Sequence, residues 1–193
     1  GFEFTPERLP ELMEESVRED HSLPDFLENV LTQERLAREE RRVKTALKLS
    51  GLSLGKTLEE YDFAFQRGLN KNQLERKENV LFLGPPGVGK SHLAQGLGIR
   101  AIQNGFSVTF TSADQLIDKL RRDEQSQSRQ RHRRKFMSTS VLIIDELGFQ
   151  TLDRKDAHLL FKVISYRYER GATIITSNKS ISQWPDMLAG DEV

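Results

Sequence analysis

The sequence predicts an α/β fold, in which a parallel sheet is flanked by helices and preceded by a small all-helical domain. Three observations carry this prediction: four short, almost continuously apolar runs, the helical segments between them, and an N-terminal stretch of helical character. The apolar runs are residues 79–83, 107–111, 141–145 and 173–177. Near-continuous apolar strands that alternate with helices are typical of a parallel sheet covered on both faces.

The helices between the predicted strands have recognisable ends. The first helix follows a glycine-rich loop and ends near Gly105. The second begins at Ser112, and Gln115 three residues later completes the pattern of a capping box. The third covers about residues 154–170 and ends at Gly171, a residue type that commonly terminates helices.

The N-terminal region is predicted to be helical over residues 6–50. Leu23-Pro24-Asp25 interrupts it, because proline disfavours helix at the residue before it. Gly51 then suits a helix C-cap. We therefore divide the chain into a helical domain, a connector and an α/β core, at residues 1–56, 57–78 and 79–193.

Composition narrows the class of protein. The chain of 193 residues has 29 basic and 29 acidic side chains and no cysteine, which excludes disulfides and thiolate metal sites. No apolar run approaches the ~18 residues of a membrane span, and the first residues lack the pattern of a signal peptide. We expect a soluble, cytoplasmic protein.

The zero net charge conceals a segregation of charge along the chain. Residues 1–34 hold two Arg against ten Asp and Glu, whereas residues 35–56 hold seven Lys and Arg against two Glu. A second basic cluster at residues 119–135 holds eight Lys and Arg against two acids. Local charge of this kind matters more than net charge for a polyanionic partner.

A glycine-rich motif follows the first predicted strand and opens a helix. It matches G-x-x-x-x-G-K-[ST] in full, a pattern whose main-chain N–H groups cradle phosphates. Lys90 reaches the β- and γ-phosphates, and the Ser91 hydroxyl is a ligand for Mg²⁺. The alternative is a glycine turn before an ordinary helix. The predicted nucleotide-contacting residues are Gly84, Pro85, Pro86, Gly87, Val88, Gly89, Lys90, Ser91 and His92.

Two further strands end in polar residues at the edge where open α/β sheets bind ligands. Asp145 follows the third apolar run and suits a Mg²⁺ contact, directly or through water, while Glu146 can orient or deprotonate the attacking water. Asn178 follows the fourth run and can hydrogen-bond the lytic water or the γ-phosphate; its alternative role is that of a turn residue. Lys90, Glu146 and Asn178 are the predicted catalytic residues.

These motifs in this order resemble the AAA+ superfamily of P-loop ATPases, and longer stretches resemble the IstB family. The stretches are GPPGVGKSHLA from residue 84, AIQNGFSV from residue 101, LIIDELGF from residue 142, HLLFKVISYRYERG from residue 158 and TIITSNKS from residue 173. IstB proteins are ATP-dependent helpers of insertion-sequence transposases, and they are similar to the DnaC and DnaI helicase loaders and more distantly to DnaA.

The resemblance implies a bacterial, Mg²⁺-dependent ATPase that binds double-stranded DNA, assists a transposase in target selection and forms a homo-oligomer with ATP between protomers. A helicase loader of the DnaC type is the alternative. A P-loop kinase of small molecules is a third, disfavoured by Glu146 and Asn178. The family pattern continues beyond Val193 into a helix with an arginine finger, so we expect the C-terminal end to be truncated. Tyr61 and Phe63 are candidates for an adenine pocket or for core packing.

The basic cluster occupies the place of an extra helix that faces the central channel in DnaA-like proteins. The resemblance therefore implies that its side chains meet DNA phosphates, and a solvated surface helix is the alternative. The cluster consists of Lys119, Arg121, Arg122, Arg129, Arg131, Arg133, Arg134 and Lys135, of which the last five are the predicted DNA contacts. The basic stretch at residues 35–48 is a second candidate surface. Arg167 and Arg170 suit the end of a helix dipole, with a neighbour-facing role in an oligomer as the alternative.

Overall fold

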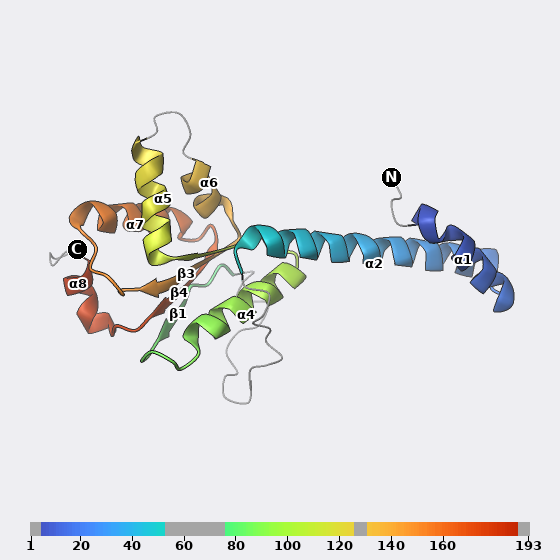
Figure 1. Ribbon diagram of the computed structural model, residues 1–193, viewed down its shortest axis with the longest axis horizontal. Helices are drawn as coiled ribbons and strands as arrows, with labels where there is room; N and C mark the ends of the chain where they lie inside the picture. The colour runs from blue at the N-terminus through green and yellow to red at the C-terminus, as the bar shows by residue number, and fades with distance from the viewer. Residues whose placement is uncertain (1–4, 53–75, 126–130, 189–193) are drawn as a thin grey trace. The chain divides into compact units, whose positions relative to one another are not determined.

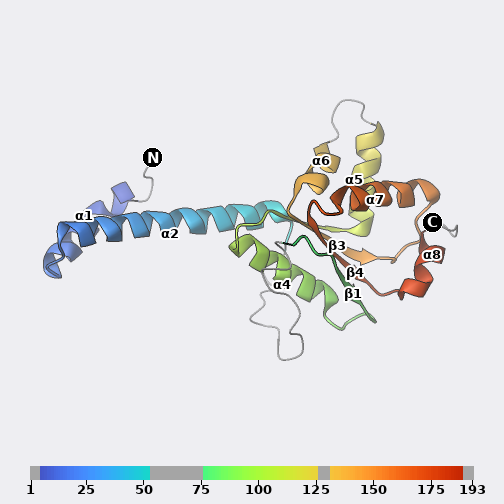
Figure 2. The ribbon, with the colours of Figure 1, turned by 180° about the vertical axis from the view of Figure 1, so that it is seen from behind.

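Figures 1 and 2 show the computed structural model, which describes residues 5–52, 76–125 and 131–188. The chain divides into two compact units, Gly1–Thr45 and Ala46–Val193. The predicted domain boundary at residue 56 and most of the predicted connector lie outside the described residues. The same holds for the candidate adenine-pocket residues Tyr61 and Phe63.

The N-terminal region is helical, as predicted, but its interruption lies elsewhere. Helix α1 spans Thr5–Arg18 and helix α2 spans Leu23–Ser50, so the break falls just before Leu23 rather than at Leu23-Pro24-Asp25. Proline is tolerated in the first turn of a helix, where its missing N–H has no intrahelical partner. The Asp25 N–H donates to Ser22 Oγ (3.4 Å), and the Ser22 N–H donates to Asp25 Oδ2 (3.3 Å), which caps the helix.

Four parallel strands form the sheet of the second unit. Their order across the sheet is β1-β4-β3-β2, so the strand that comes last in the sequence lies between the first and the third. All three pairings are parallel. The strands are β1 (Val80–Leu83), β2 (Val108–Ser112), β3 (Val141–Leu147) and β4 (Ala172–Ser177). The four predicted apolar runs are therefore confirmed as strands of one parallel sheet.

Helices cover both faces of this sheet, with α4 on one face and α5, α6 and α7 on the other (Figures 1 and 2). Alternation along β3 explains the two layers. Leu142 and Ile144 join the core beneath α5 and α7, whereas Ile143 faces α4 at Gly98. The helices are α4 (Lys90–Gln103), α5 (Ala113–Gln125), α6 (Arg131–Ser138), α7 (Arg154–Arg167) and the short α8 (Trp184–Met187), which follows a 3₁₀ turn at Ile181–Gln183.

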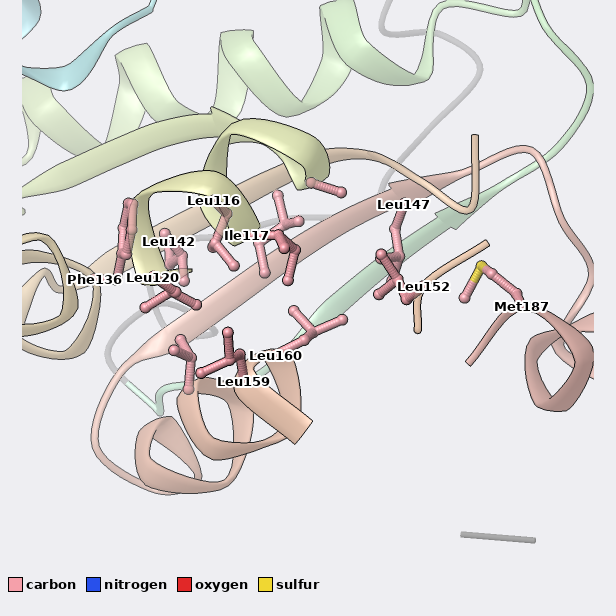
Figure 3. Packing of buried hydrophobic residues seen from close by; sticks show 13 residues of the cluster. Leu116, Ile117, Leu120, Phe136, Leu142, Leu147, Leu152, Leu159, Leu160 and Met187 are labelled. Carbon is pink, nitrogen blue, oxygen red and sulfur yellow. The ribbon is translucent and has the colours of Figure 1, made fainter. Parts of the chain in front are cut away.

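The larger apolar core lies between the sheet and the α5–α7 layer (Figure 3). Leucine side chains from α5, β3 and α7 meet there, and Phe136 of α6 and Met187 of α8 close its two ends. The predicted start of α5 is confirmed, since the Gln115 N–H donates to Ser112 Oγ (3.3 Å). Within the described ranges, no helix is long and apolar enough to cross a bilayer.

Candidate nucleotide-binding site

The glycine-rich loop connects β1 to α4, as its sequence predicts. Gly87 and Gly89 have φ values of 82° and 87°, in the left-handed region that glycine enters without a steric cost. Gly89 is the N-cap of α4, and its carbonyl accepts the first helical bond from the Leu93 N–H (2.9 Å). The partially positive N-terminal end of this 14-residue helix therefore points toward any group bound in the loop.

Lys90 holds the two ends of this loop together. Its Nζ donates to the carbonyl oxygens of Gly84 and Pro85, both at 2.8 Å. Gly84 is in turn joined to the sheet, because its N–H donates to the carbonyl of Ser177 at the end of β4 (3.3 Å). The ammonium group is thus positioned over the loop by contacts that do not depend on a ligand.

The end of β3 contains a bulge that separates its two acidic side chains. Ile144 pairs with Ile175 and Leu147 pairs with Ser177, so three steps along β3 oppose two steps along β4. Glu146, within the bulge, has a φ of 59°, which is uncommon for a residue other than glycine. As a result Asp145 is buried and Glu146 is exposed. Strained backbone of this kind is often found at functional sites.

Two hydroxyl groups of β4 replace the ladder hydrogen bonds that the bulge disrupts. Thr176 Oγ1 accepts from the Glu146 N–H (2.9 Å) and donates to Asp145 Oδ1 (2.5 Å). Ser177 Oγ donates to the carbonyl of Leu147 (2.6 Å) and accepts from the Lys179 N–H (3.1 Å). Both side chains are buried. The apolar pattern of β4 did not predict their role, although two hydroxyl residues at the end of a buried apolar strand were the available signal.

One pocket of about 350 Å³ brings the three predicted motifs together. Its walls come from the glycine-rich loop, from the β3 bulge and from the end of β4. The lining residues are Pro86, Gly87, Gly89, Lys90, Ser91, His92, Glu146, Phe149, Thr176, Ser177 and Asn178. Phe149, which no sequence motif singled out, also lines this pocket and is 72% exposed. Gly84, Pro85, Val88 and Asp145, all predicted site residues, are not among the lining residues.

The oxygen groups at this pocket suit a magnesium ion. Ser91 lines the pocket, and Asp145 lies behind Thr176 with one carboxylate oxygen engaged by that hydroxyl. Hard oxygen donors are what Mg²⁺ prefers, and it is commonly held by one or two protein groups together with substrate phosphates. Among the described residues no group of three or more His, Cys, Asp or Glu could hold a metal by itself. The donor set therefore fits a metal that binds with the nucleotide.

The predicted DNA contacts divide into two groups. Arg131, Arg134 and Lys135 are exposed on α6 and Arg133 is partly exposed, whereas Arg129 lies outside the described residues. Asp123 at the end of α5 orients α6. Its carboxylate accepts a hydrogen bond from the Arg133 N–H (2.7 Å) and lies 2.8 Å from His132 Nδ1. Burial raises the pKa of Asp123, but these hydrogen bonds outweigh it and the pKa is lowered overall.

Other basic side chains of the sequence clusters are occupied within the fold. Arg121 forms a two-pronged ion pair with Asp156 of α7, with Nε at 2.6 Å from Oδ1, and this hydrogen bond raises the pKa of Arg121. In the second candidate surface, Arg42 donates to Glu39 (2.9 Å) and Arg38 donates to Glu34 (2.8 Å). Part of each basic stretch is thereby neutralised.

Arg167 is buried, so the neighbour-facing role considered for it is wrong. It is 1% exposed, and its guanidinium donates to the carbonyls of Phe136 and Thr139 (both 2.8 Å) and to Thr173 Oγ1 (3.1 Å). Burial lowers its pKa to about 10, so the group remains charged at neutral pH. It connects the end of α6 to α7 and β4. Arg170, in contrast, is exposed and lies over the Tyr166 ring.

Comparisons with known proteins point to one family. The model of the IstB-like ATP-binding protein family matches residues 5–193. The "Insertion sequence IS5376 putative ATP-binding protein" of Geobacillus stearothermophilus is 39% identical, over 97% of this chain and 78% of that protein. The "Insertion sequence IS21 putative ATP-binding protein" of Pseudomonas aeruginosa is 38% identical, over 94% of this chain and 72% of that protein.

Solved structures show the same fold. The DnaC helicase loader has a TM-score of 0.58 at 25% identity, covering 69% of this chain and 85% of that chain. AMPPCP-bound DnaA from Aquifex aeolicus has a TM-score of 0.58 at 21% identity, covering 74% of this chain and 46% of that chain. The second unit therefore has the AAA+ P-loop fold that the order of motifs predicted.

Proposed function

The chain belongs to the family of IstB-like ATP-binding proteins, and on this premise we propose that it hydrolyses Mg-ATP to control its assembly on double-stranded DNA, where it assists a transposase in target selection. The catalytic part of this proposal is carried by one observation, the single pocket lined by the glycine-rich loop, Glu146 and Asn178. The transposition part is supported by the relatives, whose names refer to insertion sequences.

Binding of the triphosphate rests on the loop and on Lys90. Main-chain N–H groups of the loop and the first turn of α4 face the phosphates, where the partial positive charge of the helix end favours an anion. The Lys90 ammonium exchanges its two carbonyl partners for β- and γ-phosphate oxygens, which form stronger, charge-assisted hydrogen bonds. Its neighbour Ser91 and the buried Asp145 hold the magnesium ion, which neutralises phosphate charge when bound.

Hydrolysis rests on the bulge of β3 and the end of β4. Glu146 is exposed at the pocket and serves as the base that orients and deprotonates the attacking water. Asn178, directly after the neighbouring strand β4, hydrogen-bonds that water or the γ-phosphate. Thr176 maintains the geometry, because one hydroxyl fixes both the Asp145 carboxylate and the Glu146 backbone.

Assembly on DNA rests on the exposed cations of α6. Arg131 and Arg134 project from a helix whose sequence, Arg-His-Arg-Arg-Lys-Phe-Met-Ser, contains no acid. Such a surface attracts phosphates without reading bases, so we propose binding with little sequence specificity, by a homo-oligomer that holds ATP between protomers in the bacterial cytoplasm.

Replacement of Lys90 by alanine tests the nucleotide site. Loss of one charge-assisted phosphate contact is expected to weaken ATP affinity by about 10- to 100-fold, measured with a fluorescent ATP analogue. Lys155→Ala, at an exposed position of α7, is the matched control. Equal affinity in the two variants would remove the basis of the proposal. The DNA part is tested by comparing duplex binding with and without ATP, and binding that ignores both nucleotide and salt would contradict it.

A helicase loader is the second candidate, favoured by the likeness to the DnaC loader over 85% of that chain. It would use the same nucleotide chemistry with a different partner and would prefer single-stranded DNA. Affinity capture by the transposase of the same element and by the replicative helicase, each with and without ATP, distinguishes the two functions. ATP-dependent retention by the helicase alone would favour the loader.

A further inference from the structure

A second cavity lies on the opposite edge of the sheet from β1. Its volume is about 310 Å³, at the lower end of the range for ligand pockets, and it shares no lining residue with the nucleotide pocket. Its floor is the outer strand β2, and its walls are α5, α6, the end of α2 and Gly51 just after it. Figure 1 shows α5 and α6 side by side over this edge of the sheet.

The chemistry of this cavity is that of an anion site. Three basic side chains converge on it from two helices, Lys119 from α5 and His132 and Lys135 from α6. Ser112 and Gln115, at the start of α5, add a hydroxyl and an amide that can donate hydrogen bonds. Among the described residues that line the cavity, none carries a carboxylate.

Two of the three basic side chains are held in place by hydrogen bonds within the protein. Lys135 Nζ donates to the carbonyl of Leu49 (3.1 Å), and an ammonium group has two further N–H donors. His132 meets Asp123 through Nδ1 (2.8 Å), so its Nε2 edge is the one left for a ligand. Phe136, on the same helix, is buried and anchors α6. Both basic side chains are therefore positioned before a ligand arrives, which lowers the entropic cost of binding.

We propose that this cavity binds a backbone phosphate of DNA, an inference that rests on the DNA binding proposed above. The occupant is assigned from the surroundings, because the exposed Arg131 lies one turn before Lys135 on α6 and extends the positive surface beyond the cavity. A chain of phosphates can contact the cavity and this arginine together, whereas one small anion can occupy only the cavity. The cavity thus adds a fixed, partly enclosed contact to an otherwise open basic surface.

The test adds a negative charge to the cavity without removing a packed group. Gln115 is exposed in the first turn of α5, where a glutamate is compatible with the helix dipole, so Gln115→Glu is expected to fold. Lys119→Gln removes one base, and Ser165→Glu on the exposed side of α7 is the control for net charge. Binding of the full chain to a labelled DNA duplex is measured by fluorescence anisotropy at ~50 to ~200 mM salt with a saturating non-hydrolysable ATP analogue.

We expect Gln115→Glu and Lys119→Gln to weaken DNA binding several-fold and to lower the slope of log affinity against log salt by about 0.9, the value for one phosphate contact. Ser165→Glu should change neither the DNA affinity nor the salt slope. None of the three variants should change the affinity for nucleotide.

Two results would overturn the proposal. In the first, both cavity variants match Ser165→Glu while Arg131→Gln lowers the slope, which refutes the cavity contact but leaves the DNA-binding function standing. In the second, inorganic pyrophosphate, titrated into nucleotide-saturated protein by calorimetry, binds in a Lys119-dependent way while the DNA slope is unchanged. That outcome assigns the cavity to a free phosphate compound. If the unsubstituted chain showed no salt-dependent DNA binding at all, the proposed function itself would be refuted.

Discussion

The nucleotide pocket and the basic helix pair α5–α6 use opposite means to meet a phosphate. In the pocket, the decisive groups are set by buried contacts, as in the 2.5 Å bond from Thr176 to Asp145 and the 2.9 Å bond from Glu146 to Thr176. On α6, Arg131 and Arg134 are exposed. Chemistry at a γ-phosphate requires atoms in fixed positions, whereas attraction of a polyanion requires only a density of charge. Substitutions that keep the charge but change the geometry should therefore be damaging in the first region and harmless in the second.

Glu146 should show the largest effect. Glu146→Gln removes the proposed base, and the rate of ATP hydrolysis is expected to fall by about 10³-fold with nucleotide affinity retained. Glu146→Asp keeps the charge but moves the carboxylate by one methylene, and should still cost about 10²-fold. Steady-state phosphate release measures both, and Glu124→Gln at the exposed end of α5 is the control. A Glu146→Asp variant with nearly full activity would show that the position is less fixed than we infer.

Arg167 connects the end of α6 to α7 and to the start of β4, and its loss should be the largest effect on stability. Arg167→Met keeps much of the side-chain volume but leaves several buried carbonyls without a donor, including those of Phe136 and Thr139. We expect the free energy of unfolding to fall by about 3 kcal/mol. Urea denaturation measures the change, and Arg170→Met, at an exposed position, is the control. Equal stability of the two variants would contradict the connecting role.

Thr176 tests whether a hydroxyl positions the catalytic groups. Thr176→Val has a similar shape but leaves the Asp145 carboxylate and the Glu146 N–H without this partner. Turnover is expected to fall by about 10- to 100-fold with a small change in KM, because binding rests on the glycine-rich loop. Thr176→Ser retains the hydroxyl and should restore most of the rate. A variant Thr176→Ser as slow as Thr176→Val would assign the effect to packing instead.

The smallest effect is expected on α6. A double replacement of Arg131 and Arg134 by lysine keeps both charges, so duplex affinity should change by less than about twofold and the salt slope should stay the same. Replacement of both by glutamine should lower the slope by about 1.8. Anisotropy titrations over a range of salt compare the two. A large loss with lysine would mean that α6 recognises DNA by geometry, as the pocket recognises a nucleotide.

Much of this architecture could be predicted from the sequence. The four apolar runs predicted the parallel strands, and the glycine-rich motif predicted the loop that caps α4. Glu146 and Asn178 line the same pocket as the glycine-rich loop. The sequence predicted this, because open α/β sheets bind ligands at the carboxyl ends of their strands. These features depend on local patterns that repeat in many chains, which is why one sequence suffices to predict them.

What the sequence did not predict depends on contacts between distant residues. The β3 bulge places Glu146 at a φ of 59°, and neither its position nor the hydroxyl groups that support it follow from periodicity. Arg167 looked like an ordinary cation at a helix end, yet its donors are used across α6 and β4. Arg121, counted with the DNA-facing cluster, pairs instead with Asp156, which is 35 positions away.

The position of β4 also constrains when the site can form during synthesis. Because β4 lies between β1 and β3, those two strands do not pair with each other. The Gly84 N–H after β1 donates to the carbonyl of Ser177, and the adjacent Thr176 accepts from the Glu146 N–H of β3. A nascent chain that has emerged from the ribosome only as far as β3 would lack the strand that lies between the two halves of the pocket. Affinity for ATP should therefore arise late and abruptly, once about residue 178 has left the exit tunnel.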